Sequence, residues 1–406
     1  MRLTLPTVFI LLTVMIDAMG IGLIMPVMPD LLQEVQGAGL ANAAIWGGVL
    51  ITAFAVMQFL FGPVIGNLSD RYGRRPVLLV SLCVMAVGYL LMGVAGSIWL
   101  LLGARILCGI ASATHATAAA FMADTLPPAQ RGRGFGLISA AFGAGFVLGP
   151  LIGGILGDIG TRAPFYLAAI LAGGNFILGL IVLPETVTDA NRRAFSWRRA
   201  NPLGALVKIR QLPGLGRLLG VFFLYQISFN VYPIIWSFFT TARFGWDASM
   251  IGLSLAAFGI SMAVIQGGLI GFVIRHIGER NTVLLGFSFG MVSFVALVLV
   301  RDGMLALALT PVCALAAMSA PAMQAIMSRS TAADAQGELQ GILASASALA
   351  MIVSPVIMTN VFAAFTAEGA ALFLPGAPFL ASLGLLLLGA LLFLGHPRAT
   401  APRIDA

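Results

Sequence analysis

The chain has 406 residues, of which 60% are hydrophobic and only 9% are charged, and its net charge is +7. A soluble protein of this length would need many more charged side chains on its surface. The positive charges are spread over segments between apolar runs, which excludes a nucleic-acid-binding stripe. Because the apolar runs are continuous rather than alternating, they exclude a transmembrane β-barrel and predict an all-α polytopic membrane protein.

Twelve apolar runs are long enough to cross a bilayer as helices of about 20 residues. In the first half of the chain they cover residues 7–29, 42–65, 76–96, 98–123, 134–157 and 163–184. In the second half they cover residues 215–240, 249–274, 282–300, 304–327, 339–364 and 373–395. We therefore expect a six-helix half over residues 1–184, a polar linker over 185–213 and a second six-helix half over 214–406.

The distribution of Lys and Arg predicts the orientation of the spans. With the N-terminus inside, eighteen of the 22 basic residues fall in cytoplasmic segments and three in outer loops. Short loops rich in Lys and Arg stay on the cytoplasmic side. The sequence thus predicts that both termini are cytoplasmic.

A short charged segment, Gly66 to Pro76, joins the second and third spans. Its pattern Gly66-x6-Gly73-Arg74-Arg75 recurs 205 residues later as Gly271-x6-Gly278-Glu279-Arg280. Two six-helix repeats related by an axis normal to the membrane are a transporter architecture, with the binding site at their interface. The repeat therefore predicts a transporter.

Asp17 is the one acidic residue well inside a predicted span, and Arg105 is the one basic residue inside a span. A carboxylate at that depth costs at least about 2.5 kcal/mol on insertion scales, so we expect Asp17 to face a cavity or a partner. A carboxyl group that alternates between apolar surroundings and an arginine can take up and release a proton. We expect Asp17 to couple transport to protons, with Arg105 as its partner; a permanent structural pair is the alternative.

His115 follows ten residues after Arg105 on the same predicted helix. Because a histidine titrates near neutral pH, His115 is a second candidate for proton transfer. A hydrogen-bonded packing role is the simpler interpretation.

Glycines recur at every fourth position of the fifth span, at Gly145, Gly149 and Gly153. This spacing gives one flat helix face that another backbone can approach closely. The adjacent Pro150 removes a backbone hydrogen bond and favours a bend. We expect a tight helix contact, either a hinge or an ordinary small-residue interface.

The sequence resembles the major facilitator superfamily, and within it the twelve-span drug–proton antiporters. Gly66 to Arg75 looks like the superfamily's signature between its second and third helices. The stretch from Gly145 to Gly154, which includes Pro150 and Gly153, looks like the motif of its antiporters. Over almost the whole chain the sequence is most similar to the tetracycline efflux proteins, for example in the stretch from Asp17 to Pro26 and in Ala123-Asp124-Thr125.

The resemblance implies a proton-coupled exporter with an inner gate. Gly66, Asp70, Arg71, Gly73, Arg74, Arg75 and Asp124 would form that gate, in which Asp70 faces the eleventh span and the arginines pair with acids such as Asp124. The glycines would provide close approach and positive φ. A purely topogenic charge cluster is the alternative.

Three positions depart from the tetracycline exporters. Gly88 stands where they carry an acid in the third span, and Gly290 or Phe289 where they carry one in the ninth. Met262 stands where the best-known members have a histidine. The sequence therefore predicts export more firmly than it predicts tetracycline as cargo.

Polar, aromatic or flexible side chains in the middle of spans are candidates for the substrate pocket. They are Gln58, Gln226, Asn230, Trp236, Met262, Gln266 and Gln324. The cargo would be an amphiphilic drug-like molecule, with tetracycline or several drugs as candidates. Proton-coupled transport of a specific metabolite, including uptake, is the alternative.

Other classes of function fit the sequence less well. The chain has no Gly-x4-Gly-Lys-Ser/Thr loop, so direct use of ATP is not expected. The spans lack the clustered His, Cys and carboxylates of a membrane enzyme, so we expect neither an enzyme nor a metal or cofactor site. A non-transporting scaffold stays open. The expected partners are a small-molecule substrate, protons and membrane lipid, for a monomer in the bacterial inner membrane.

Overall fold

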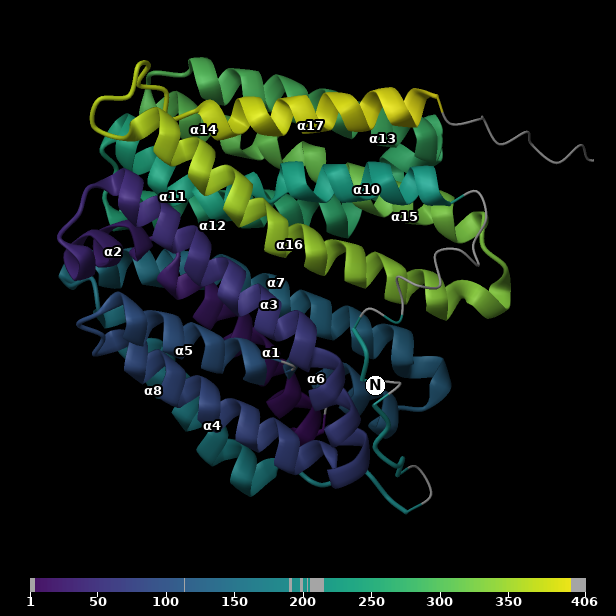
Figure 1. Ribbon diagram of the computed structural model, residues 1–406. Helices are drawn as coiled ribbons and strands as arrows, with labels where there is room; N and C mark the ends of the chain where they lie inside the picture. Colours follow the sequence, from purple (N-terminus) through teal and green to yellow (C-terminus); the bar gives the residue numbers. More distant parts are fainter. Residues whose placement is uncertain are drawn as a thin grey trace, which may run out of the picture.

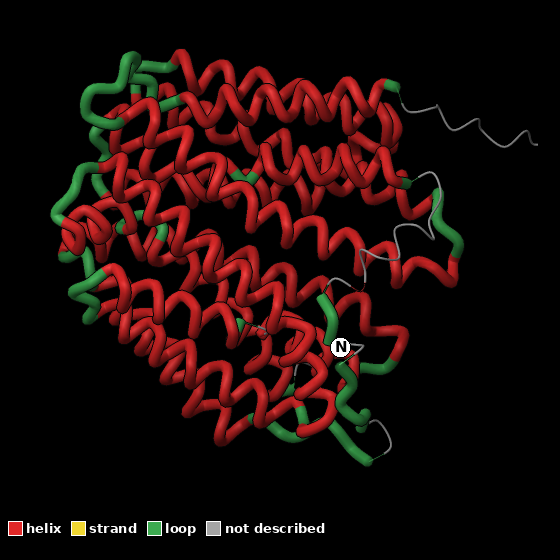
Figure 2. The backbone as a smooth tube through the Cα atoms, in the orientation of Figure 1, coloured by secondary structure: helices red, strands yellow, loops and turns green. Residues whose placement is uncertain are grey.

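The computed structural model of the chain describes residues 4–112, 114–189, 192–197, 200–202, 204 and 215–395, and every regular element in these ranges is a helix (Figure 2). The helices of the first half are α1 (Leu5–Ile24), α2 (Met28–Gln36), α3 (Leu40–Tyr72), α4 (Arg74–Gly93), α5 (Ile98–Ala111), α6 (Thr114–Thr125), α7 (Pro128–Ile159) and α8 (Ala163–Val182). Those of the second half are α10 (Gly216–Phe229), α11 (Val231–Phe244), α12 (Ala248–Val264), η2 (Ile265–Leu269), α13 (Ile270–Leu299), α14 (Gly303–Ala314), η3 (Leu315–Met318), α15 (Ser319–Arg329), η4 (Ala333–Ala335), α16 (Gln336–Thr366) and α17 (Ala377–Leu394).

Eleven helical stretches in the described ranges are long and apolar enough to cross a membrane. The longest, Ala248–Leu299, bends at Gly278, where φ is 79° and ψ is 165°. Such a conformation suits glycine and ends a helix. The bend separates the predicted eighth and ninth spans, and the all-α polytopic fold is confirmed.

The helices lie in two groups, with α1 to α8 below and α10 to α17 above in Figure 1. Two helix pairs form most of the boundary between the groups, because α7 packs against α12 and α3 packs against α16. At the left of Figure 1, α11 also contacts α2 and α3. We call this end of the bundle the α2 end, and the opposite end, which carries the N-terminus and the predicted linker, the linker end.

The two groups are closed against each other at the α2 end. The Ser237 hydroxyl donates to the Met25 carbonyl at 2.9 Å, and the Ser249 amide donates to Asp158 at 3.3 Å. Gly48 of α3 lies directly against Thr359 of α16. All three side-chain hydrogen bonds described between the groups lie in the half of the bundle toward α2; the third joins Thr52 to a carbonyl of α16.

The short charged segment from Gly66 to Pro76, which joins the second and third spans, proves to be mostly helical. Helix α3 continues to Tyr72 and α4 begins at Arg74, which leaves Gly73 as the one non-helical residue. Its φ of 113° makes the turn possible, whereas Gly66 lies inside α3 with nothing close to it. Polar residues beyond the apolar core extend both helices.

Several predicted spans are broken near their middle or end. The seventh span divides at Asn230 into α10 and α11, three residues before Pro233, which has no amide hydrogen to donate. The tenth divides at η3, four residues after Pro311. The fourth divides after Ala111, and the first ends at Ile24, before α2. Breaks inside spans are tolerated where the backbone is buried in protein or lines a cavity.

Candidate functional site

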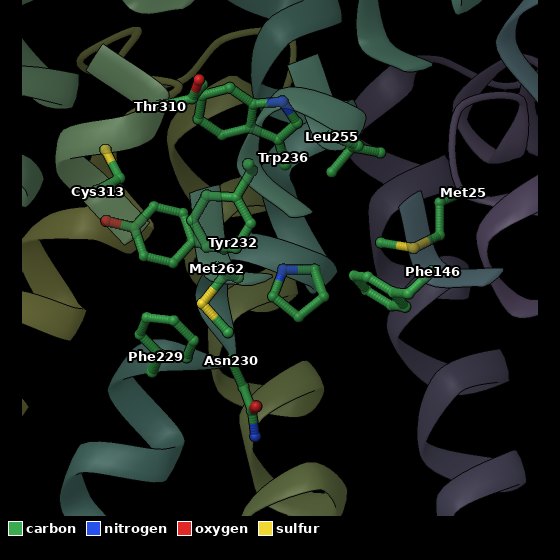
Figure 3. Close-up of a pocket in the computed structure, with 12 residues that line it drawn as sticks. Met25, Phe146, Phe229, Asn230, Tyr232, Trp236, Leu255, Met262, Thr310 and Cys313 are labelled. Carbon is green, nitrogen blue, oxygen red and sulfur yellow. The ribbon is translucent and has the colours of Figure 1, made fainter. Parts of the chain in front are cut away.

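A cavity of about 620 Å³ lies at the boundary between the two helix groups. Figure 3 shows Met25 and Phe146 on the side of the first group and the remaining labelled residues on the side of the second. Its lining is uncharged and mostly aromatic or flexible: Met25, Phe146, Phe229, Asn230, Tyr232, Pro233, Trp236, Leu255, Phe258, Met262, Thr310 and Cys313. This chemistry fits an apolar ligand with few polar groups.

The rings of the cavity wall are held in fixed positions. Phe229, Tyr232 and Phe258 form a triangle with centroid separations of 5.2–6.2 Å. The indole nitrogen of Trp236 donates to Ser254 at 2.8 Å, so this ring has a single orientation. Rigid aromatic surfaces of this kind bind planar apolar groups with little loss of side-chain entropy.

Polar groups are few at this cavity. The side-chain amide of Asn230 makes a long contact of 3.5 Å with the Ser354 hydroxyl. The Tyr232 hydroxyl is buried beside the Ser293 hydroxyl and the Cys313 thiol. Asn230 and Tyr232 are therefore among the few polar groups that a ligand would meet here.

Only part of the predicted pocket lines this cavity. Asn230, Trp236 and Met262 do, whereas Gln226 donates to Ser347 at 3.1 Å and Gln266 lies exposed in η2. Gln324 is partly buried in α15 away from the cavity, and Gln58 lines a second one. For these four glutamines the substrate-binding role stays a prediction, since residue type and depth do not report which face of a helix a side chain occupies.

The second cavity, of about 600 Å³, separates α3 from α16. Gln58, Phe59 and Pro63 of α3 face Ala344, Ser345 and Met351 of α16 across it, and Pro202 of the predicted linker closes one side. The pair α3 and α16 thus touches near the α2 end and is separated farther toward the linker end.

Asp17 and Arg105 lie in a polar region between α1, α4 and α5, but the expected ion pair does not form in this structure. Among the described contacts, an Nη of Arg105 lies 4.0 Å from the sulfur of Met28, and its buried Nε has no hydrogen-bond partner. Met28 begins α2, and the arginine is turned toward it. The role of the two residues in proton transfer stays a prediction.

His115 lies apart from this region. It is exposed on α6 and packs edge-to-face on Phe142 of α7, with a centroid distance of 5.7 Å. No described contact joins it to Asp17 or Arg105. A second proton site at His115 stays a prediction.

Arg74 is the centre of the charged cluster at the linker end. It bonds Asp124 of α6 at 3.1 Å and Asp70 of α3 at 2.6 Å. The backbone amides of Arg74 and Arg75 both donate to Glu185, at 2.9 and 3.2 Å. Three helix ends and the start of the linker are thereby tied together.

One member of the predicted gate lies outside this arrangement, and another has a different partner from the expected one. Arg71 is exposed and lies over its neighbour Tyr72, 5.1 Å from the ring centroid. Asp70 was expected at the eleventh span, which is α16, but its carboxylate pairs with Arg74 instead. Because α16 is separated from α3 at this end, no contact between them is available in this conformation.

The second half carries a counterpart of this cluster with its charges reversed. Glu279 pairs with Arg329 at 3.0 Å, and both lie 205 residues after Arg74 and Asp124. Gly278, 205 residues after Gly73, shares its positive φ. The internal repeat seen in the sequence thus corresponds to a repeated turn and a repeated ion pair.

The fifth-span glycines lie on one face of α7 against α1. Hypothetical side chains at Gly145, Gly149 and Gly153 would meet the carbonyls of Met15, Met19 and Leu23. An adjacent face of α7 meets α12, where Gly154 lies against Ala248 and the Pro150 carbonyl lies against Gly252. Helix α7 therefore connects the helix of Asp17 to the other helix group.

Sequence reasoning missed Glu185 and most of the cavity wall. Glu185 accepts four backbone amides, those of Arg74, Arg75, Thr186 and Val187. A signal for the wall was present, since Phe229, Tyr232, Pro233 and Trp236 follow the i, i+3, i+4, i+7 spacing of one helix face.

Comparison with known proteins places these features in a wider context. The sequence profile of the Major Facilitator Superfamily matches residues 10–355 and 217–406. The class C tetracycline resistance protein of Escherichia coli is 40% identical over 92% of this chain and 96% of its own length. The class G protein of Vibrio anguillarum is 40% identical over 87% of this chain and 89% of its own.

More distant relatives share the architecture. Multidrug resistance protein 2 of Bacillus subtilis (strain 168) is 27% identical over 69% of this chain and 70% of its own. The crystal structure of the human organic anion transporter TETRAN superposes with a TM-score of 0.68 at 25% identity, over 96% of this chain and 99% of that one. That of the nucleoside transporter NupG superposes with a TM-score of 0.78 over 98% and 99%, but at 12% identity it shows the fold alone.

Proposed function

Because the chain belongs to the Major Facilitator Superfamily, we propose that it is a proton-coupled antiporter of the bacterial inner membrane that exports amphiphilic, drug-like compounds. The observation that carries this proposal is the uncharged aromatic cavity between the two helix groups. It lies where transporters built from repeats place their substrate sites. The printed names of the relatives, which are tetracycline and multidrug resistance proteins, support export of drugs.

We infer that this conformation is open toward the cytoplasm. The basic residues of the linker end favour the cytoplasmic side for that end and for both termini. The closed contacts at the α2 end then form the outer seal. In this state cargo enters from the cytoplasm or the inner leaflet, through the space between α3 and α16. The chain acts as a monomer with two halves and a linker over 185–213, much of which lies outside the described residues.

The proton is carried by Asp17. It is the one acid inside the bundle of spans, and its helix contacts both the glycine face of α7 and, through Met25, the cargo cavity. Protonation of Asp17 would remove a charge from α1 and so change the balance between the two conformations. Asp17 does not line the cavity, so proton and cargo act on the same helix at different places rather than competing for one site.

The cargo is an uncharged or weakly charged molecule with a planar aromatic part. The cavity offers ring faces, methionine sulfur and the hydrogen-bonding groups of Asn230 and Tyr232. Tetracycline is a candidate through the named relatives. At Gly88, which stands where the resemblance places an acid in the tetracycline exporters, the neighbouring space holds the sulfur of Cys108.

The cluster of Arg74, Asp124 and Glu185 forms the first half of an inner gate. It stabilises the ends of α3, α4 and α6 as one body, and the pair Glu279–Arg329 does the same in the second half. Closing the cytoplasmic side would bring these two charge-reversed pairs toward each other. Ion pairs that form in one state and break in another are a common switching device.

The proposal is tested in inverted membrane vesicles that are acidified inside. Addition of a transported drug should raise the internal pH, because protons leave as drug enters. Asp17→Asn should abolish this proton movement. It should still permit labelled drug outside the vesicles to exchange with unlabelled drug inside them when the pH is equal on both sides. Proton-driven accumulation that survives in Asp17→Asn would contradict the proton role.

A further inference from the structure

One buried polar side chain close to Asp17 belongs to none of the sites described so far. We propose that Tyr89 is a positioning residue for proton exchange, whose hydroxyl bridges the carboxyl group of Asp17 and the guanidinium of Arg105. This inference deepens the proposed function and rests on it. It concerns the group that holds the proton-carrying acid, which neither the sequence motifs nor the relatives' names indicate.

The Tyr89 hydroxyl reaches from one helix to another. The residue belongs to α4 and is only 4% exposed, and its hydroxyl lies against Gly20 of α1 so closely that a side chain at position 20 would collide with it. Gly20 follows Asp17 by three residues, so both lie on the same face of α1. The phenol is therefore held beside α1, one turn from the acid.

Tyr89 interacts electrostatically with both charged residues. It is within interaction range of both Asp17 and Arg105, whereas the two charged groups form no direct pair. Cys108 is the other group within range of both. A thiol is a weak donor, and this sulfur packs over Gly88, so the phenol is the stronger bridging group.

The chemistry of the site requires such a bridge. An ionised carboxylate inside a membrane protein needs hydrogen-bond donors, and none is described for Asp17. A phenol donates one hydrogen bond and accepts others, so Tyr89 can donate to Asp17 and accept from Arg105 at once. Arg105 is free to do this, because its buried Nε is unpartnered and its Nη group has only the Met28 sulfur.

No other titratable group is placed to take this role. The helices packed against α1 and α4 are α3, α5, α6, α7 and α8. Apart from Arg105 and Cys108, their titratable groups lie at the helix ends or face other partners: Asp70, Arg71, Tyr72, His115, Asp124, Arg131, Arg133, Asp158 and Tyr166. Cys83 of α4 is exposed on the outside of the bundle.

The proton itself is exchanged at Asp17, and Tyr89 keeps its own proton throughout. A proton from the acidic side binds the Asp17 carboxylate and is released from the same oxygen to the other side. The hydrogen bond from Tyr89 stabilises the ionised form of Asp17. Removing that bond should make Asp17 hold its proton up to a higher pH.

The test is the pH dependence of proton-driven drug transport in inverted vesicles, measured for Tyr89→Phe. The variant keeps the ring and loses only the hydroxyl. We expect the midpoint of the pH profile to move upward by about one pH unit, since a hydrogen bond to a charged group has a strength of that order. A merely structural role for Tyr89 would lower the rate at every pH and leave the midpoint in place, and this result would overturn the proposal.

Two further variants make the test specific. Tyr225→Phe removes a buried hydroxyl of the second half, which donates to the Ala316 carbonyl at 3.0 Å, and should leave the midpoint unchanged. Gly20→Ala displaces the Tyr89 hydroxyl by a different route and should also move the midpoint upward. If Tyr89→Phe does not accumulate in the membrane, an unchanged midpoint in Gly20→Ala overturns the proposal instead.

The same experiment distinguishes failure of the Tyr89 proposal from failure of the antiport mechanism. If the parent chain moves protons with drug and the midpoint does not respond to either variant, only the role of Tyr89 falls. If the parent chain moves no protons, the antiport mechanism falls and the bridging role falls with it.

Discussion

At the scale of single residues, equivalent positions of the two repeats have different surroundings: those of the first half lie near Asp17, and those of the second half line the aromatic cavity. Cys108 and Arg105 lie beside Asp17, and the residues 205 positions later, Cys313 and Thr310, line the aromatic cavity. One copy of the repeat thus lies beside the acid and the other lines the proposed cargo cavity. This arrangement predicts that cargo affinity and proton coupling respond to different substitutions.

Trp236→Ala should weaken cargo binding by ten- to a hundredfold without affecting the pH dependence of transport. The substitution removes a large, fixed ring from the cavity wall, and buried aromatic anchors dominate binding energies. Equilibrium binding of a fluorescent cargo to the purified protein measures the effect. Trp99→Ala, at a ring that is 68% exposed, is the matched control and should bind cargo normally. Equal affinity in both variants would exclude this cavity as the cargo site.

The candidate residues show what sequence can and cannot supply. Asp17 and Arg105 stand out in any reading of the sequence, because charges inside apolar runs are costly and few. Gln226, Gln266 and Gln324 lie inside predicted spans as Asn230 does, but only Asn230 faces the cavity. Which face of a buried helix a residue occupies depends on packing with neighbours distant in sequence, and spans that are apolar all round carry little periodic signal.

At the scale of helices, α7 joins the helix of Asp17 to the second helix group. One face of it lies against the backbone of α1 and the other against α12, with glycine at the points of contact. Under the proposed mechanism, a movement of α1 on protonation of Asp17 would be transmitted through these contacts to the boundary between the halves. The four-residue spacing of Gly145, Gly149 and Gly153 predicted such a contact, but not that α1 would be the partner.

Gly149→Ala should destabilise the protein, whereas Gly143→Ala on the same helix should not. A side-chain carbon at position 149 would lie 2.6 Å from the Met19 carbonyl oxygen, and one at position 143 would meet nothing within 4 Å. Forcing an atom into a packed contact costs about 1–3 kcal/mol. Thermal unfolding of the two purified variants measures the difference, and equal melting temperatures would show that α1 and α7 are not closely packed.

The inner gate predicts a charge-reversal experiment. Arg74→Asp should reduce transport at least tenfold. The new carboxylate would lie beside Asp70 and Asp124, so that three acids repel one another. Adding Asp124→Arg should restore part of the activity, since Glu279 and Arg329 show that the reversed pair fits this turn. Arg133→Ala, at an exposed arginine on the same side, should leave transport unchanged. Failure of the double variant to exceed Arg74→Asp would indicate that the pair only sets topology.

At the scale of the whole molecule, the sequence predicted twelve spans and a repeat, while the conformation came only from the structure. Composition and run lengths determine how many helices cross the membrane. Which end of the bundle is closed depends on small differences between two packings of the same helices. The direct contact of Gly48 with Thr359 has no signature in either segment.

A disulfide across the closed end should lock the transporter. In Gly48→Cys/Thr359→Cys the two side chains start from adjacent positions on α3 and α16, and an oxidant should cross-link them and stop transport until a reductant is added. Gly66→Cys/Gly337→Cys, on the same two helices at the linker end, has no close neighbours at either position and should not cross-link in this conformation. Transport that continues in the cross-linked protein would contradict alternating access between these ends.

The central claim is that Asp17 couples drug export to protons, and the most direct measurement is drug-induced proton movement in inverted vesicles acidified inside. The parent chain is compared with Asp17→Asn over a panel of amphiphilic aromatic drugs that includes tetracycline. The account predicts a rise of internal pH on addition of a transported drug, lost in Asp17→Asn while drug exchange at equal pH persists. A drug-dependent pH rise of equal size in Asp17→Asn, or drug accumulation with no proton movement in the parent chain, would contradict it.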